Sequence, residues 1–444
     1  MFKIIKKIFR IALPAVGEMM LYMLIWVIDT MMVGNYGGET AVSAVGLSSE
    51  IFYTITNLFV GMGLGVGMTS IISRAMGAKD MERARRISHM GIRITLYMGV
   101  AMFFIFYFYS WEIMQLAKAQ GEVLPLAARY FRICSLMVIF NVVRNAITSI
   151  FIGCQDTKTP LYVAGIINII NIVLDYLLIF GKFGFPEMGI DGAAWATVAA
   201  NLGGFVFILF KIKKLPFRLG LDRGESSERG ELIKLSLPAA LQEGAFSIAR
   251  LLAVIMIMNL GSKAFAANQI TVAIESISFM PGYGIAIACS TLVGFSMGEN
   301  NIKRVREYLL FSSIIGMVIM GIPALLFYFI PETLIGVFLK GDDRTVIELG
   351  ASCLKIAALT QIPSALCMIL EGGMKGSGDT RRPFYIVFFC SWCIRLPLMT
   401  YFIYIKRYPL TTAWKIILLH WTVESIIVVY VVYRKYFRKK GAEI

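Results

Sequence analysis

Two carboxylates within long apolar runs are the residues best suited to chemistry in this sequence. Asp29 lies in the stretch DTMMVG, and Asp175 lies in NIVLDYLLIFG. Asn171 precedes Asp175 by four residues, so the two share a face if this run is a helix. Burial of a carboxyl group favours its neutral form, which lets such a group take up and release a proton. Its oxygens, with an amide oxygen beside them, equally suit Na⁺. We therefore predict an ion site for H⁺ or Na⁺ at Asp29, Asn171 and Asp175.

A second group of polar residues lies in the other half of the chain. Glu243 and Glu275 fall near the middle of apolar runs, where a charge is costly and seldom retained without a role. We predict that they contact a cationic substrate or pair with Arg250. Phe279 and Met280, in the stretch FMPG, are predicted to line an adaptable cavity, because methionine repacks around different shapes. Further candidates of lower priority are Glu18, Glu50 and Glu424.

The elements that must hold these residues are membrane spans. Of the 444 residues, 58% are hydrophobic and only 16% are charged, and the mean hydropathy is +0.73. A soluble protein carries about 25% charged residues, so soluble enzymes are excluded. The runs are too long and too continuous for lipid-facing barrel strands, which predicts an all-α membrane protein with twelve transmembrane helices. The spans are expected near 11–33, 41–71, 90–111, 126–152, 161–181, 191–212, 233–259, 264–294, 308–330, 346–373, 384–405 and 412–434.

The two halves of the chain repeat each other. Three pairs of motifs correspond: ALPA with LPAA, SRAMGAKDMERAR with FSMGENNIKRVR, and GCQDTKTP with GSGDTRRP. Matched residues in these pairs are separated by 224, 221 and 223 positions. We predict two pseudo-symmetric six-helix lobes, 1–212 and 233–444, around a central cleft, with a cytoplasmic linker at 213–232. Because each lobe has an even number of spans, both have the same orientation, as in carriers built from parallel repeats.

The charge distribution predicts the orientation. Lys+Arg 43 against Asp+Glu 28 gives a net charge of +15, and the basic residues gather in every second connector. The positive-inside rule then places both termini in the cytoplasm of a multi-pass protein of the inner membrane. The basic connectors are expected to contact membrane lipids and no nucleic acid. The scattered cysteines and the two histidines suggest neither a disulfide framework nor a metal site. No phosphate-binding loop is present, so energy must come from a gradient.

The order of motifs resembles the multidrug and toxic compound extrusion (MATE) family. The stretches are ALPAVGEMMLYMLIWVIDTMMVGNYG, ISRAMGAKDMERARR, NIVLDYLLIFG, PEMGIDGAAWAT, GDTRRP and IRLP. The resemblance covers nearly the whole chain and implies a twelve-helix carrier that expels organic, often cationic, compounds in exchange for protons or Na⁺. By this resemblance, four residues match the polar site of bacterial and archaeal members: Asp29, Asp175, Asn171 and Asn145. Tyr130 matches a tyrosine near that site. Pro14, at the start of the first span, matches a position where helix bending has been linked to protonation.

This sequence departs from one branch of the family. Some relatives place a cation site in the second half, with acids on helices seven and ten. Here the corresponding part of helix ten reads TQIPSALCMIL and has no carboxylate before Glu371, which is close to the cytoplasmic end of the helix. A cation site of that kind is therefore disfavoured.

The predicted function is secondary active export of amphipathic or cationic small molecules in exchange for H⁺ or Na⁺. We expect a monomer without a cofactor, and a transporter instead of an enzyme. One alternative is a lipid-linked oligosaccharide flippase of the wider superfamily. A membrane-embedded transferase is disfavoured by the scarcity of histidine and by the absence of a large polar domain in the sequence.

Overall fold

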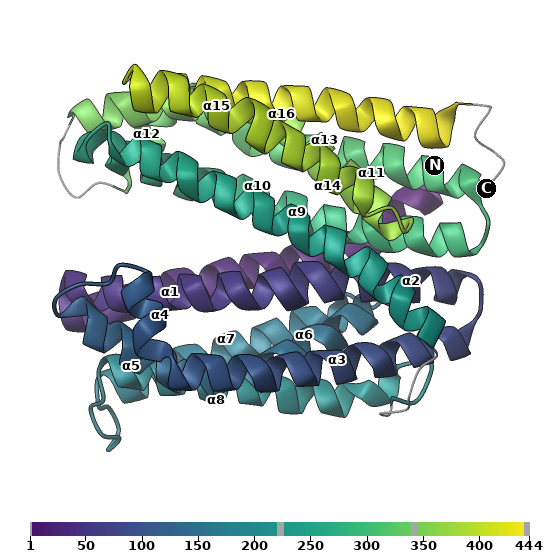
Figure 1. Cartoon of the computed structure of the whole chain (residues 1–444), viewed down its shortest axis with the longest axis horizontal. Coiled ribbons are helices and arrows are strands. Elements are labelled where there is room, and N and C mark those ends of the chain that lie inside the picture. The colour runs from purple at the N-terminus through teal and green to yellow at the C-terminus, as the bar shows by residue number, and fades with distance from the viewer. Residues whose placement is uncertain (1, 220–225, 339–343, 439–444) are drawn as a thin grey trace. The chain divides into compact units, whose positions relative to one another are not determined.

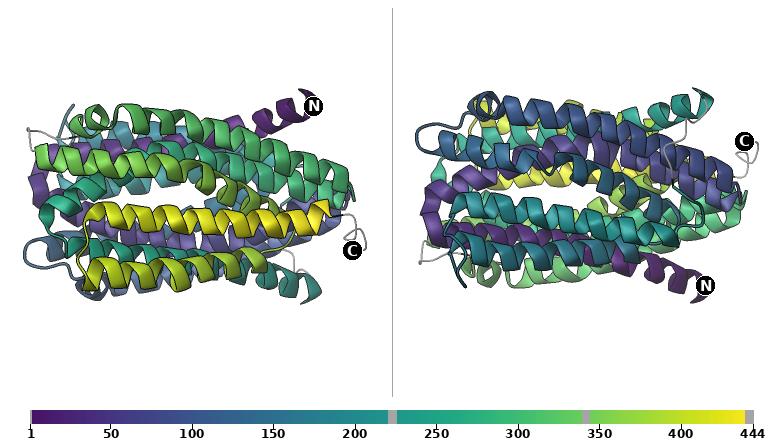
Figure 2. Two further views of the ribbon diagram at one scale, coloured as in Figure 1. Left: turned by 90° about the horizontal axis from the view of Figure 1, so that it is seen from above. Right: turned by 90° about the horizontal axis from the view of Figure 1, so that it is seen from below.

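The computed structural model describes residues 2–219, 226–338 and 344–438, and throughout these ranges the regular structure is helical (Figure 1). Its contacts divide the chain into two compact units. The amino-terminal unit is Gly17–Ser236, and the carboxyl-terminal unit combines Met1–Val16 with Leu237–Ile444. Within each unit the long helices run roughly along one direction (Figure 2).

The helices of the amino-terminal unit begin within α1 and end at the start of α9. They are α1 (Phe2–Thr56), η1 (Asn57–Gly65), α2 (Val66–Gly77), α3 (Met81–Phe108), α4 (Ser110–Leu116), α5 (Val123–Ser135), α6 (Val138–Gly153), α7 (Lys158–Ile179), α8 (Ile190–Lys211) and η2 (Ile212–Lys214).

The carboxyl-terminal unit contains most of α9 and every described helix after it. These are α9 (Ser226–Met258), α10 (Ser262–Gly298), α11 (Ile302–Phe329), α12 (Pro331–Gly336), α13 (Arg344–Gly376), α14 (Arg381–Phe388), η3 (Phe389–Arg395), α15 (Leu396–Met399), η4 (Thr400–Ile405), α16 (Leu410–Val432) and η5 (Tyr433–Phe437).

The described helices include eleven that are long and apolar enough to cross a membrane. The pair Val123–Ser135 and Val138–Gly153, which is bent by 55°, brings the number of candidate spans to twelve when it is counted as one span. The first two spans follow each other directly, and only Gly38, with φ 64°, interrupts the helical backbone between them. Large apolar side chains such as Trp26, Phe104 and Phe210 are exposed along the spans, as lipid contact requires. The prediction of an all-α protein with twelve spans is therefore confirmed.

The repeat is visible in the turns that start equivalent helices. Asp80 accepts a hydrogen bond from the Arg83 amide at the start of α3, 2.9 Å away, and Asn301 does the same for the Arg304 amide at the start of α11, at 3.1 Å. Side-chain caps of this kind satisfy amides that have no partner inside the helix. The preceding residues, Lys79 and Asn300, both have positive φ. These basic segments are thus short turns followed by helix at α3 and α11.

Helix α1 starts well before the predicted first span. It begins at Phe2, about three turns ahead of Pro14, so the proline lies inside the helix and does not begin it. The early turns are apolar on one side: Ile8 and Ile11 are buried in a cluster with Ile285 and Leu292 of α10. The first segment of α1 therefore belongs to the carboxyl-terminal unit.

The first segment of α9 shows the reciprocal arrangement. Helix α9 begins at Ser226, within the predicted linker 213–232, and Leu232 and Leu235 are buried in the core of the amino-terminal unit. The compact units consequently divide after Val16 and Ser236, whereas the lobes predicted from the sequence are 1–212 and 233–444. The difference comes from burial: Ile8 and Ile11 belong to a core cluster of the carboxyl-terminal unit, whereas Leu232 and Leu235 belong to the core of the amino-terminal unit.

An ionic contact also joins this segment to the amino-terminal unit. Glu231 accepts hydrogen bonds from Arg74 at 3.1 Å and from Arg83 at 2.5 Å. We expect Glu231→Gln to lower the free energy of unfolding by about 1 kcal/mol, because these charges are only partly shielded from solvent. The measurement is thermal unfolding of the detergent-solubilised protein. Glu82→Gln, which removes a more exposed partner of Arg85, is the matched control; equal shifts for the two variants would contradict the prediction.

Candidate functional site

The predicted ion site lies within the amino-terminal unit and is assembled from α1 and α7. Asp175 on α7 is completely buried, and Asn171, one turn earlier, is 2% exposed. Asp29 on α1 is close enough to Asp175 for the two carboxyl groups to interact electrostatically. The structure therefore brings together the three residues that the sequence predicted for this site.

The carboxyl oxygens of Asp175 are unusual for buried polar atoms. Among the described residues, neither oxygen has a hydrogen-bond donor, and the same holds for Oδ1 of Asp29. Buried polar groups are normally hydrogen-bonded, and a buried charge without a partner is strongly unfavourable. A proton or a bound cation would remove this cost. The geometry is thus suited to binding and releasing a positive ion.

Tyr130 joins this site from α5. Its side chain is 2% exposed, and its hydroxyl group is hydrogen-bonded with Ser49 and Thr197. Asp29 also acts electrostatically on Tyr130. Ser49 and Thr197 were missed by the sequence analysis, because small hydroxyl residues are common in membrane helices and their sequence context gives no distinct signal.

A chain of amides extends from Tyr130 into the unit. Asn201 on α8 donates to the carbonyl oxygen of Thr197 at 2.9 Å, and Asn141 donates to Asn201 at 3.1 Å. Asn145 donates in turn to Asn141 at 3.2 Å. The predicted residue Asn145 is thereby linked to the surroundings of Tyr130. Asn141 and Asn201 were missed, although the four-residue spacing of Asn141 and Asn145 in an apolar run was a usable signal.

The acids predicted in the second half lie in the carboxyl-terminal unit and have different surroundings. Glu275 on α10 accepts hydrogen bonds from Thr360 and Gln361 of α13, both at 3.3 Å. Glu243 on α9 accepts a hydrogen bond from Ser247, one turn later on the same helix, at 3.3 Å. Glu275 is therefore part of a polar contact between two helices.

The remaining predicted residues are on α10 and α1. Phe279 is partly buried against the apolar cluster of the carboxyl-terminal unit, and Met280 beside it is also partly buried. Pro14 lies in α1 two residues before Val16, where the two compact units divide. The helical backbone is unbroken at Pro14, since the only non-helical residue within α1 is Gly38.

The residues at the ion site also limit the ions it can hold. Across the described ranges, no group of three or more His, Cys, Asp and Glu residues is placed to hold a metal ion. The site offers carboxyl and amide oxygens. These oxygens can bind a hard cation such as Na⁺, and the carboxyl oxygens can take up a proton.

The sequence matches a known family model in both halves. The MatE model matches residues 14–177 and again 238–400. The two matches are displaced by the same spacing as the motif pairs, so the internal repeat is a repeat of this family's own unit.

Curated relatives and solved structures agree with this match. A probable multidrug resistance protein NorM of Thermotoga maritima is 31% identical over 415 residues, which cover 91% of this chain and 86% of that protein. A probable multidrug resistance protein YoeA of Bacillus subtilis is 26% identical and covers 84% of this chain and 81% of its own length.

The solved structures share the fold. The crystal structure of MATE in complex with MaL6 has a TM-score of 0.89 at 22% identity and covers 97% of this chain and 96% of its own. A MOP superfamily transporter from Pyrococcus furiosus has a TM-score of 0.89 at 23% identity with the same coverage. The family match in both halves, the relatives along nearly the whole chain and the shared helical fold lead to one conclusion: this multi-pass membrane protein belongs to the MatE family and is a transporter, not an enzyme.

Proposed function

We propose that this transporter is a secondary active exporter of amphipathic or cationic small molecules, driven by an inward gradient of H⁺ or Na⁺. The observation that carries the proposal is the pair of membrane-buried carboxyl groups at Asp29 and Asp175, whose oxygens include three without hydrogen-bond donors among the described residues. Relatives that are named as probable multidrug resistance proteins support the substrate class.

The proposed mechanism is competition between ion and substrate. Ion binding at Asp29 and Asp175 in the outward-open state favours substrate release, and release of the ion into the cytoplasm permits the next substrate to bind. Linkage requires the ion to bind one state, or the substrate-free form, more tightly. Asn171 and Asn145 belong to this ion site in the proposal, and Pro14 is the hinge.

Five residues are proposed to contact the substrate. Tyr130, Phe279 and Met280 supply aromatic and polarisable surfaces, and Glu243 and Glu275 supply negative charge for a cation. This assignment rests on residue chemistry and on the partial burial of the residues in the second half.

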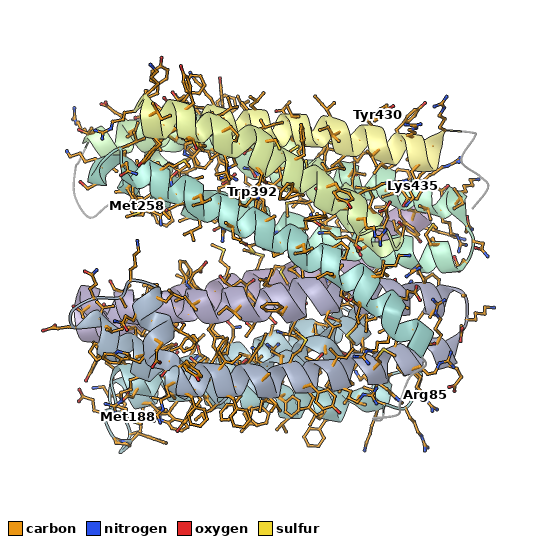
Figure 3. The ribbon with its side chains drawn as sticks, viewed as in Figure 1. Arg85, Met188, Met258, Trp392, Tyr430 and Lys435 are labelled. Carbon is orange, nitrogen blue, oxygen red and sulfur yellow. The ribbon has the colours of Figure 1, made fainter. Side chains whose placement is uncertain are left out.

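The proposed cellular setting is the inner membrane, with the protein as a monomer and both termini in the cytoplasm. Within the amino-terminal unit, Arg85 and Met188 lie at opposite ends (Figure 3). Lys435 and Met258 are separated in the same way within the carboxyl-terminal unit (Figure 3). The basic end of each unit is proposed to face the cytoplasm and the headgroups of anionic lipids.

The decisive experiment is efflux of a fluorescent organic cation from proteoliposomes under a pH gradient and, separately, under a Na⁺ gradient. We expect one gradient to drive dye export against a concentration difference, while protein-free liposomes show only leak. Absence of export under both gradients would contradict the proposal and would make lipid-linked oligosaccharides the next substrates to test.

A further inference from the structure

An aromatic cluster lies on the surface of the amino-terminal unit at the carboxyl end of α3. Seven of the nine residues in FFIFYFYSW (103–111) are aromatic. Phe106 is buried in the core of the unit, whereas Phe104, Phe108 and Tyr109 are 53%, 65% and 59% exposed. The exposed rings belong neither to the core nor to the ion site, so they are available to a molecule outside the unit.

The rings of this cluster are held against one another along α3. Phe104 and Phe108, one turn apart, are stacked with their centroids 6.1 Å apart and an interplanar angle of 3°. Phe103 and Tyr107 form a second pair at 5.6 Å, and Phe103 also contacts Phe104 at 5.4 Å. The cluster therefore presents an ordered apolar face that follows the helix axis.

An arginine from a neighbouring helix is fixed at the edge of this face. Helix α5 packs against α3 at this end (Figure 1). Cζ of Arg132 on α5 lies 4.5 Å from the centroid of the Tyr107 ring, and its Nη2 donates to the Tyr107 hydroxyl oxygen at 3.2 Å. Tyr107 is one residue before the end of α3 at Phe108. The guanidinium group thus lies at the level where this span ends, which is where aromatic and basic side chains meet lipid headgroups.

The positive charge of Arg132 is not neutralised by an acid of the described chain. Arg129, three residues earlier on α5, forms an ion pair with Asp191, but Arg132 forms none among the described residues, although Glu112 and Glu122 are exposed at this end of the unit. A guanidinium group has five N–H donors, and the bond to Tyr107 uses one. The remaining donors can hold a phosphate group through two parallel hydrogen bonds.

The second repeat has related residues but a different arrangement. At the spacing of 223 that relates GCQDTKTP to GSGDTRRP, Arg132 corresponds to Lys355 on α13, which is exposed. At the spacing of 221 found for the third spans, Tyr107 corresponds to Tyr328 on α11. Among the described residues no cation lies over the Tyr328 ring, and a lysine ammonium lacks the planar fork of donors. Lys355 is therefore a natural control for Arg132.

The combination of a fixed cation and an apolar face selects the ligand. An acyl chain can lie along the stacked rings of Phe104 and Phe108, while the phosphate at the end of the same molecule reaches Arg132. A soluble anion would use the guanidinium group but leave the rings uncovered. A headgroup that also carries an amine would bring a positive charge toward Arg132, which is unfavourable. Charge complementarity therefore favours a phospholipid whose headgroup is negative.

We propose that Arg132 and the rings of Phe104, Tyr107 and Phe108 form a binding site for one anionic phospholipid. Arg132 holds the phosphate, Tyr107 positions the guanidinium group, and an acyl chain lies along α3. In the orientation proposed above, this lipid belongs to the outer leaflet, so the site is distinct from the basic connectors at the other end of the unit. The site goes beyond the proposed export function and does not depend on it.

The test is native mass spectrometry of the purified full-length protein after addition of phosphatidylglycerol or of phosphatidylcholine with the same acyl chains. The wild type is expected to bind phosphatidylglycerol more tightly than phosphatidylcholine. Arg132→Gln should weaken phosphatidylglycerol binding about fivefold, the effect of one basic residue at a membrane surface, and should leave phosphatidylcholine binding unchanged. Tyr107→Phe, which keeps the ring but removes the hydroxyl acceptor, should have a smaller effect. Phosphatidylglycerol with a photoactivatable acyl chain should crosslink to residues 103–109 in the wild type and less in Arg132→Gln.

Controls separate this site from general contact with lipid. Lys355→Gln removes the corresponding exposed cation of the second repeat and should bind phosphatidylglycerol as the wild type does. Equal phosphatidylglycerol binding by the wild type and a monodisperse Arg132→Gln protein would overturn the proposal, as would an equal loss in Lys355→Gln or equal crosslinking by the two lipids. A dimer mass that disappears in Arg132→Gln would assign the face to a second copy of the chain and would also overturn it. These measurements use no ion gradient, so failure here is distinguishable from failure of the export proposal.

Discussion

Asp175→Asn is expected to reduce gradient-driven export in proteoliposomes to the rate of passive leak. The amide has nearly the shape of the carboxyl group but neither takes up a proton nor supplies a negative charge for a cation. Asp29→Asn should have the same consequence, because the two carboxyl groups act on each other. The measurement is dye export under the gradient that drives the wild type.

Stability measurements distinguish this effect from a folding defect. Asp175 is completely buried and its oxygens have no hydrogen-bond donors among the described residues, so its ionised form destabilises the fold. Asp175→Asn should therefore unfold at the same temperature as the wild type or at a higher one, as expected where function requires a destabilising residue. Glu112→Gln, an exposed acid on α4, is the matched control and should retain export. Full export by both aspartate variants would move the coupling site elsewhere.

Gly376→Ala should produce the largest loss of stability among single-methyl additions in the carboxyl-terminal unit. A Cβ atom at this position would overlap the carbonyl oxygen of Ser290 on α10. One turn earlier, a Cβ at Gly372 would lie 2.7 Å from the carbonyl oxygen of Ala286. Small residues spaced in this way let helices approach closely in membranes. Because the obstacle is backbone, overpacking should cost about 1–3 kcal/mol.

The matched control for this prediction is Gly321→Ala on α11. No atom lies within 4 Å of a Cβ built at Gly321. Alanine favours the helix over glycine by about 1 kcal/mol, so this variant should be neutral or stabilising. Thermal unfolding in detergent and the yield of monodisperse protein are the measurements. If the two alanine variants unfold at the same temperature, close packing of α10 against α13 does not limit stability.

Much of the fold was predictable because each membrane span is a property of consecutive residues. A helix needs about twenty apolar residues to cross a bilayer. Such a run can be recognised without knowing which distant residues it contacts. The repeat was equally accessible, since motifs such as GCQDTKTP and GSGDTRRP recur at a constant spacing. The ends of helices were less accessible: α1 extends back to Phe2, because its basic first residues continue the helix beyond the apolar run.

The candidate sites were predictable only in part. Asp29 and Asp175 could be found from sequence because a carboxylate in an apolar run is conspicuous by itself. The amide chain could be found only in part: Asn141 and Asn145 share α6 at a visible spacing, but the bond from Asn141 to Asn201 depends on how α6 packs against α8. Glu275 was visible as an acid, but its hydrogen bonds with Thr360 and Gln361 depend on how α10 packs against α13.

The sequence by itself determined the class of the protein, its twelve spans, its duplication and the family to which it belongs. These properties follow from the hydropathy of consecutive residues and from the order of short motifs along the chain. Only the tertiary structure decided which polar side chains meet, and that the first turns of α1 pack with the second half while those of α9 pack with the first. The reason is physical: hydrogen bonds require atoms within a few ångströms of each other, and the packing of helices distant in the chain brings those atoms together.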